Sequence, residues 1–160
     1  MTVLEQKKDI HWPHIKVAVV AARWNSFVTD EMLDAAVQAL QAKGIQDSNI
    51  TSMRCPGSFE IPLTCKWCLE HLEVDGVVAI GAVIRGGTPH FDYVCDSVTR
   101  GITDLNLSSG KPVSFGVLTT DTVDQARERA SEEKGNKGAE AALALCEMIA
   151  LEQSIKSSSG

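Results

Sequence analysis

The segment Arg85-Gly86-Gly87-Thr88-Pro89-His90 combines residue types that bind anions with one that transfers protons. Two consecutive glycines give the backbone the freedom to turn its amides toward an anion. Thr88 can cap a helix that begins here and Pro89 suits its first turn, so the positive helix end would face the same anion. A helix N-terminus favours the neutral imidazole, so His90 could accept and return a proton beside a bound phosphate or carboxylate. The alternative is a capped turn with a solvent-facing histidine.

A second candidate segment, Cys55-Pro56-Gly57-Ser58-Phe59-Glu60, places polar and aromatic side chains at the expected start of a helix. Ser58 and Glu60 could hydrogen-bond a polyhydroxyl ligand that packs beside Phe59. The alternative is a well-capped helix in which Glu60 only interacts with the helix dipole. Trp24 follows an apolar run and is either ordinary packing or a platform for a flat heterocycle.

The rest of the sequence predicts the elements that must position these segments. Four strands are predicted, at 15–22, 49–54, 75–83 and 112–118. The first and third are nearly continuous apolar runs that are rich in Val and Ile. Helical spacing and helix-start signals predict helices at 28–43, 60–72 and 90–107, then one from Thr122 and one from near Asn136. Strands that are apolar on both faces are typical of a parallel sheet covered by helices on both sides.

This alternation predicts an α/β fold: a three-layer αβα sandwich with a four-stranded parallel sheet, doubly wound and flavodoxin-like. We expect a single domain at 15–154, preceded by an N-terminal arm at 1–14 and followed by a flexible tail at 155–160. Ligands of such folds bind at the carboxyl ends of the strands. Both candidate segments and Trp24 follow directly after predicted strands, so a site is expected in these loops.

The composition of the 160 residues argues against several classes of function. A net charge of −6 without a basic stripe argues against nucleic-acid binding. The longest apolar run is well short of the roughly 20 residues that span a bilayer, so we expect a soluble protein. Neither a Walker loop nor a G-x-G-x-x-G after the first strand is present, which argues against nucleoside triphosphates and dinucleotides. Five cysteines without a secretory signal suit free thiols in a reducing cytoplasm.

Cys65-Lys66-Trp67-Cys68 has the spacing of redox and zinc sites. No second cysteine pair or Cys/His pair completes a metal set, and the stretch is predicted to be helical. We therefore expect two thiols that pack inward, with redox chemistry as the alternative. Arg129 and Lys137 add positive charge late in the chain. The simplest interpretation is that both side chains lie on exposed helix faces in contact with solvent.

Five segments, in order, resemble the lumazine synthase family over about residues 15–153. They are Arg23-Trp24-Asn25, 56–62, 81–93, 115–121 and 135–142. The resemblance implies an enzyme that condenses 5-amino-6-(D-ribitylamino)uracil with 3,4-dihydroxy-2-butanone 4-phosphate, without a metal or organic cofactor. The products would be 6,7-dimethyl-8-ribityllumazine, phosphate and water, in the penultimate step of riboflavin biosynthesis.

The resemblance also assigns roles to individual residues. His90 would transfer protons during Schiff-base formation and phosphate elimination. The residues implied in phosphate binding are Gly86, Gly87, Thr88 and Arg129. Those implied in binding the pyrimidine ring and its ribityl chain are Trp24, Ser58, Phe59, Glu60, Ala82, Val83, Ile84, Phe115 and Lys137. At Trp24 the family more often has Phe, and a larger indole is expected to tighten the binding of flavin-like product.

The family further implies homo-oligomers, either pentamers or hollow shells of 60 subunits built from twelve pentamers. Active sites lie between adjacent subunits, so Phe115, Arg129 and Lys137 would come from the neighbouring chain. Residues 129–138 contain no insertion between the last two helices, a compactness that resembles the shell-forming members and favours a shell. Riboflavin synthase is a further candidate partner.

Two alternatives to synthesis remain besides the redox role. The first is a flavin-binding or storage protein that kept the site and lost turnover, although storage alone would need neither His90 nor Arg129. The second is a related riboflavin synthase on a similar fold, which would consume lumazine rather than make it.

Overall fold

In a computed structural model that describes residues 1–160, four parallel strands form one sheet in the order β2-β1-β3-β4. The strands are β1 (Val17–Ala22), β2 (Ile50–Cys55), β3 (Gly76–Ile84) and β4 (Val113–Thr120). The helices are α1 (Ser26–Lys43), α2 (Ile61–His71), α3 (His90–Ser109), α4 (Val123–Ala130) and α5 (Lys137–Ser158). Short 3-10 turns lie at Trp12–His14, Asp47–Asn49, Ser58–Glu60 and Glu132–Lys134. The predicted strands and helices are all present, with boundaries shifted by a few residues at most.

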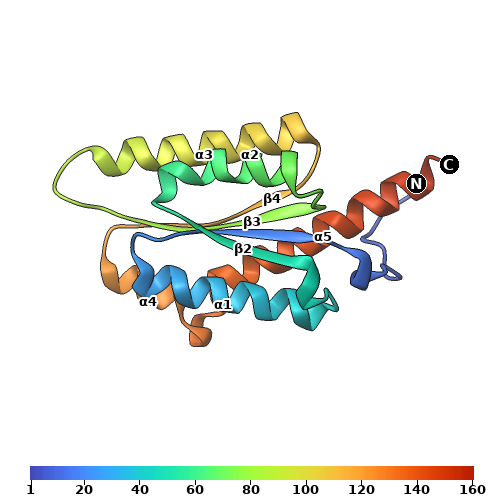
Figure 1. Cartoon of the computed structure of the whole chain (residues 1–160), viewed down its shortest axis with the longest axis horizontal. Helices are drawn as coiled ribbons and strands as arrows, with labels where there is room; N and C mark the ends of the chain where they lie inside the picture. The colour runs from blue at the N-terminus through green and yellow to red at the C-terminus, as the bar shows by residue number, and fades with distance from the viewer.

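The helices cover both faces of the sheet, so the predicted three-layer αβα sandwich and its flavodoxin-like strand order are confirmed. Helices α2 and α3 lie on one face, and α1, α4 and α5 lie on the other (Figure 1). Successive residues of β1 point to opposite faces: Val19 packs in the core beneath α1 and α5, whereas Val20 packs in the core beneath α2 and α3. Every residue of β1 is buried, as expected for a central parallel strand.

Side chains cap the last two helices, as their sequences predict. Thr122 Oγ1 accepts a hydrogen bond from the Gln125 backbone N–H at 3.1 Å, and Gln125 Oε1 accepts one from the Thr122 N–H at 3.3 Å. Asn136 Oδ1 accepts from the Gly138 and Ala139 amides at 2.8 and 3.2 Å. Two α5 amides that would otherwise lack an acceptor are therefore satisfied by one buried side chain.

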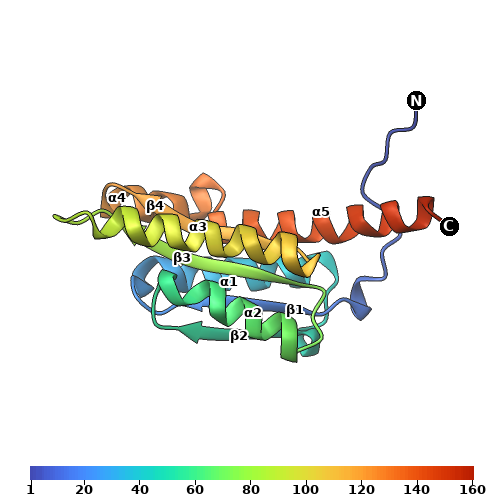
Figure 2. The same ribbon diagram turned by 90° about the horizontal axis from the view of Figure 1, so that it is seen from above.

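Both ends of the chain lie on the side of the molecule opposite the carboxyl ends of the strands (Figures 1 and 2), but Figure 2 shows the N-terminal segment leading away from the end of α5. Residues 1–11 form neither helix nor strand, and the Lys7 N–H bonds to the Ala150 carbonyl of α5 at 3.2 Å. Helix α5 continues to Ser158 and projects beyond the sheet (Figure 2), so most of the segment 155–160, expected as a tail, is helical. No helix combines the length and apolar character that crossing a membrane requires.

Candidate active site

The loops after β1, β2 and β3 enclose a cavity of about 440 Å³, a size that suits a small-molecule ligand. All of these loops lie at the carboxyl edge of the sheet, the edge at which such folds bind ligands (Figure 1). The cavity is lined by Trp24, Asn25, Ser58, Phe59, Glu60, Ala82, Val83, Ile84, His90 and Val94. The structure therefore brings together every candidate residue from these three loops except Gly86, Gly87 and Thr88, which precede His90 in the β3–α3 loop and do not line the cavity.

The Trp24 indole packs directly against the backbone of Gly57. A Cβ atom at Gly57 would lie 2.7 Å from Trp24 Cζ3 and closer still to Cε3, so only glycine leaves room for the ring. The Trp24 N–H also bonds to the Pro56 carbonyl at 2.9 Å, which ties the β1–α1 loop to the turn after β2. Because 61% of Trp24 remains exposed, most of the side chain is open to a stacking partner.

Ser58 offers the cavity a buried hydroxyl that has no partner. The residue is 6% exposed, and its Oγ makes no hydrogen bond within the chain. Gly81 provides the space for it, since a Cβ there would lie 2.7 Å from Ser58 Oγ. An unpaired buried hydroxyl is costly, and a polar ligand in the cavity would offer it a partner.

Glu60 stabilises the turn that carries these side chains. Its Oε2 accepts a hydrogen bond from the Gly57 amide at 3.0 Å, so the carboxylate caps the 3-10 turn at Ser58–Glu60 through a specific bond rather than through the helix dipole alone. Because Glu60 also lines the cavity, the capping role and contact with a ligand are compatible.

Asn25 and Val94 line the cavity without having been singled out in the sequence. Asn25 adopts a left-handed conformation with φ 64°, and its Nδ2 donates to the Ala82 carbonyl at 2.9 Å. This bond fixes the β1–α1 loop to the end of β3. The sequence signal that could have identified Asn25 is its residue type, because Asn adopts the left-handed backbone conformation more readily than most residues.

The loop between β3 and α3 leaves its amides without acceptors. The N–H groups of Gly86, Gly87 and Thr88 make no hydrogen bond within the chain. Thr88 Oγ1 lies 3.4 Å from the His90 N–H, a long cap for α3, which begins at His90. The loop therefore presents free donors at a helix N-terminus, an arrangement that suits an anion.

The glycine pair does not depend on a left-handed backbone conformation. Neither Gly86 nor Gly87 has a positive φ, and a Cβ at either would meet nothing within 4 Å. Neither local conformation nor packing within the chain therefore requires glycine here. The remaining physical reason for glycine at these positions is that it lets a ligand or a second subunit approach the backbone closely.

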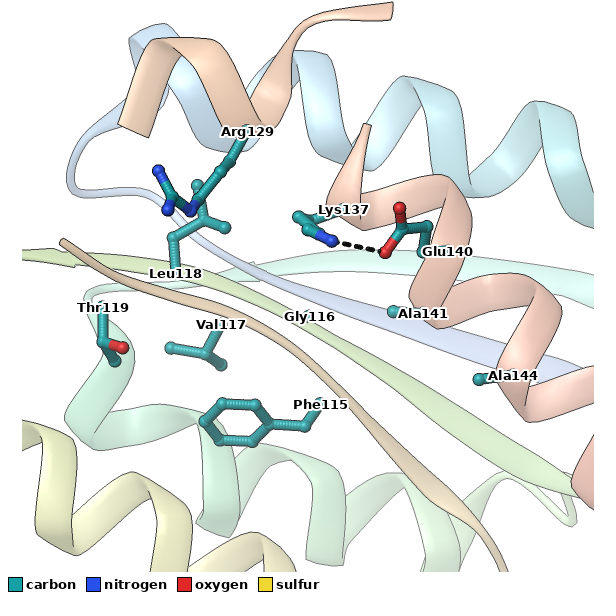
Figure 3. Close-up of a pocket in the computed structure, with 10 residues that line it drawn as sticks. All are labelled: Phe115, Gly116, Val117, Leu118, Thr119, Arg129, Lys137, Glu140, Ala141 and Ala144. Carbon is teal, nitrogen blue, oxygen red and sulfur yellow. Dashed lines mark hydrogen bonds and ion pairs between the residues drawn. The ribbon is translucent and has the colours of Figure 1, made fainter. Parts of the chain in front are cut away.

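Three candidate residues lie at a different place. Phe115, Arg129 and Lys137 line a second cavity of about 370 Å³ formed by β4, α4 and the start of α5 (Figure 3). Lys137 Nζ lies 2.7 Å from Glu140 Oε2, whereas Arg129 forms no ion pair and donates only to the Gln125 carbonyl, at 3.2 Å. Within one chain, these three residues do not join His90 around the first cavity.

The family model for 6,7-dimethyl-8-ribityllumazine synthase matches residues 14–153. The chain belongs to the lumazine synthase family. It is therefore an enzyme of the transferase class that forms dimethylribityllumazine in riboflavin biosynthesis. The match covers all four strands and every helix of the sandwich except the last five residues of α5, and the residues that line both cavities lie within it.

The paired cysteines of this lumazine synthase family member pack inward, as predicted. Cys65 and Cys68 lie on α2 and are 0% and 2% exposed. Burial raises the pKa of both thiols above the usual value, most strongly at Cys65. Both side chains therefore stay protonated near neutral pH, which argues against a redox role for them.

Proposed function

We propose that the substrates are 5-amino-6-(D-ribitylamino)uracil and 3,4-dihydroxy-2-butanone 4-phosphate, bound in the cavity at the carboxyl edge of the sheet. The observation that carries this proposal is the convergence of an exposed indole, an unpartnered buried hydroxyl and an imidazole on one cavity in a member of this family. Trp24 would stack on the pyrimidine, and Phe59 would pack beside the ribityl chain. Ser58 and Glu60 would bind the ribityl hydroxyls, and the backbone of residues 82–84 would orient the ring.

The chemistry needs no nucleophile from the protein. The substrate amine adds to the ketone carbonyl and loses water to give a Schiff base; phosphate is then eliminated, and ring closure releases a second water. His90 would carry the protons that these steps move, while the amides of Gly86, Gly87 and Thr88 would bind the phosphate. Holding both substrates in one cavity supplies the proximity that a two-substrate condensation requires.

A complete site, we propose, includes the second cavity of an adjacent subunit. Phe115 and Lys137 of that subunit would border the pyrimidine, and Arg129 would pair with the phosphate. Two observations support this: the three side chains lie outside the first cavity, and Arg129 is not neutralised by a carboxylate. We propose a pentamer as the ring that closes these contacts, and a shell of twelve pentamers because only a short 3-10 turn separates α4 from α5. A cytoplasmic location and an association with riboflavin synthase belong to the same proposal.

The proposed reaction is tested by mixing the purified protein with both substrates and recording absorbance and fluorescence. The lumazine spectrum should grow well above the spontaneous rate, with one phosphate released per lumazine formed. Consumption of added lumazine would instead indicate a riboflavin synthase. No acceleration, together with bound riboflavin, would favour the storage protein.

Replacing Trp24 by Phe should weaken riboflavin binding. The indole offers a larger face than a phenyl ring, and it is exposed beside the cavity. We expect the dissociation constant to rise by about threefold to tenfold, in line with a stacking difference of roughly 1 kcal/mol. Quenching of flavin fluorescence measures this without relying on tryptophan emission. Equal affinities in the two proteins would contradict a special role for Trp24.

Replacing Gly87 by Ala should separate ligand binding from stability. The new Cβ meets no atom of the chain, so the free energy of unfolding should change by no more than about 0.5 kcal/mol. The KM for the butanone phosphate should rise, because the methyl group would occupy the approach to the loop amides. Urea unfolding and steady-state kinetics give the two values. An unchanged KM would place the phosphate elsewhere.

A further inference from the structure

Arg85 is the most heavily engaged charged side chain at the carboxyl edge of the sheet. Its Nε donates to Asp121 Oδ1 at 2.8 Å, and its Nη1 lies 3.5 Å from Asp92 Oδ1. Its guanidinium also lies over the Phe91 ring, 4.3 Å from the ring centroid. The hydrogen bond to Asp121, followed by the two carboxylate charges, raises the pKa of Arg85 above its usual value.

These contacts surround the loop whose amides are free. Arg85 directly precedes Gly86, and Asp92 lies in the first turn of α3, two residues after His90. Asp121 directly follows β4, the strand that pairs with β3. The backbone N–H of Arg85 bonds to the carbonyl of Thr120, the last residue of β4, at 2.9 Å. One guanidinium therefore joins the entry of the loop, its exit and the start of the next loop.

The ion pairs of Arg85 with Asp92 and Asp121 affect the local charge around the loop more than the stability of the fold. All three side chains are about half exposed or more, and exposed ion pairs contribute little to stability. Without Arg85, however, two unpaired carboxylates would flank the loop, where they would repel an approaching phosphate. With Arg85 in place, one of the two negative charges is cancelled.

Arg85 is also poorly placed to bind phosphate itself. Two carboxylates already occupy its guanidinium, and it does not line the cavity that contains His90. Arg129, which has no carboxylate partner and donates only to a backbone carbonyl, is free to make that contact from an adjacent subunit under the proposed function. Arg85 therefore acts on the phosphate through the aspartates rather than directly.

We propose that Arg85 is a positioning residue of the phosphate subsite, which holds Asp92 and Asp121 and cancels one of their two negative charges so that a phosphate ester can bind at Gly86–Thr88. This inference rests on the proposed function, since it assumes that the phosphate of the substrate occupies this loop. It predicts that affinity for phosphate depends on the balance of charge in this cluster.

The experiment compares Arg85→Gln, Arg85→Lys and the triple variant Arg85→Gln/Asp92→Asn/Asp121→Asn in the full-length protein. For Arg85→Gln we expect the KM of the butanone phosphate and the dissociation constant of inorganic phosphate to rise about tenfold or more. The KM of the pyrimidine should stay within about twofold of wild type, because a local change of charge leaves the pyrimidine contacts intact. Arg85→Lys, which keeps the charge, and the triple variant, which removes the carboxylates, should both recover most of the phosphate affinity.

Arg100→Gln is the matched control. Arg100 lies on α3, the helix that carries Asp92, and pairs with Asp96 at 3.8 Å further along that helix, so its loss should leave both KM values near those of wild type. Phosphate binding is measured by calorimetry, a readout that does not require turnover. A wild-type protein that makes no lumazine would overturn the proposed function.

Three results would overturn the Arg85 inference in an active enzyme. An unchanged phosphate KM in Arg85→Gln would show that the aspartates do not act on the subsite. Failure of the triple variant to recover affinity would point to direct contact between Arg85 and phosphate. An equal rise in the KM of both substrates, with a lower midpoint of urea unfolding, would indicate a purely structural role.

Discussion

Co-assembly of His90→Ala and Arg129→Ala subunits should restore much of the lumazine synthesis that each variant loses when it is assembled alone. His90 lines the cavity at the ends of β1, β2 and β3, whereas Arg129 lines the separate cavity beside β4. If each active site joins the first cavity of one subunit to the second cavity of its neighbour, a mixed oligomer contains some sites with both native residues. Those sites should work at the wild-type rate.

The expected effects are large enough to measure. Loss of His90 should lower kcat by about 10²-fold or more if it is the proton-transfer group. Loss of Arg129 should raise the KM of the butanone phosphate by roughly tenfold to a hundredfold, since a charge-assisted contact contributes about 1.5–3 kcal/mol. In a random equal mixture, about a quarter of the sites would pair a native His90 with a neighbouring native Arg129.

The measurement is the initial rate at limiting butanone phosphate after the two variants are co-expressed or refolded together. Mixing them after separate assembly provides the control, because subunits that do not exchange form no mixed sites. A second mixture, of wild type with the double variant His90→Ala/Arg129→Ala, should retain about a quarter of the wild-type activity if sites are shared and about half if they are not. Activity equal to the average of the separate variants would place each complete site within one chain.

Sequence alone predicted the fold because its strongest signals are local. The uninterrupted apolar runs of β1 and β3 read directly as central strands, and both strands are almost wholly buried. Thr122 and Asn136 marked helix starts through side-chain chemistry that acts over two or three residues. The end of α5 was harder to predict, because a run of serines gives little signal for or against a last helical turn.

The site was predicted less completely because its geometry depends on contacts between distant residues. The bond from Asn25 to Ala82 spans 57 positions, and that from Arg85 to Asp121 spans 36. No local pattern predicts either one. The glycine pair at 86–87 illustrates the same limit, because its residue type indicates backbone freedom but not the open space that a Cβ at either position would meet. Local patterns indicated the residues near each loop, whereas the involvement of Phe115, Arg129 and Lys137 in completing the site was predicted only from the family resemblance.

Gly138→Ala should destabilise the protein more than any other glycine substitution in the chain. A Cβ at Gly138 would lie 2.7 Å from the carbonyl carbon of Met32 and 2.8 Å from its Cα, and closer still to its carbonyl oxygen. These are backbone atoms of α1, which cannot rotate away as a side chain would. The start of α5 would have to move, together with the buried cap at Asn136.

The loss should reach about 3 kcal/mol, the upper end of the usual cost of overpacking. Urea unfolding measures it, with Gly87→Ala as the control because its Cβ meets nothing. Since Lys137 directly precedes Gly138, the same shift should displace a residue of the second cavity and impair neighbouring sites. A free energy of unfolding within about 0.5 kcal/mol of wild type would mean that α1 and α5 can separate at little cost. The glycine would then serve assembly or catalysis rather than the contact between these two helices.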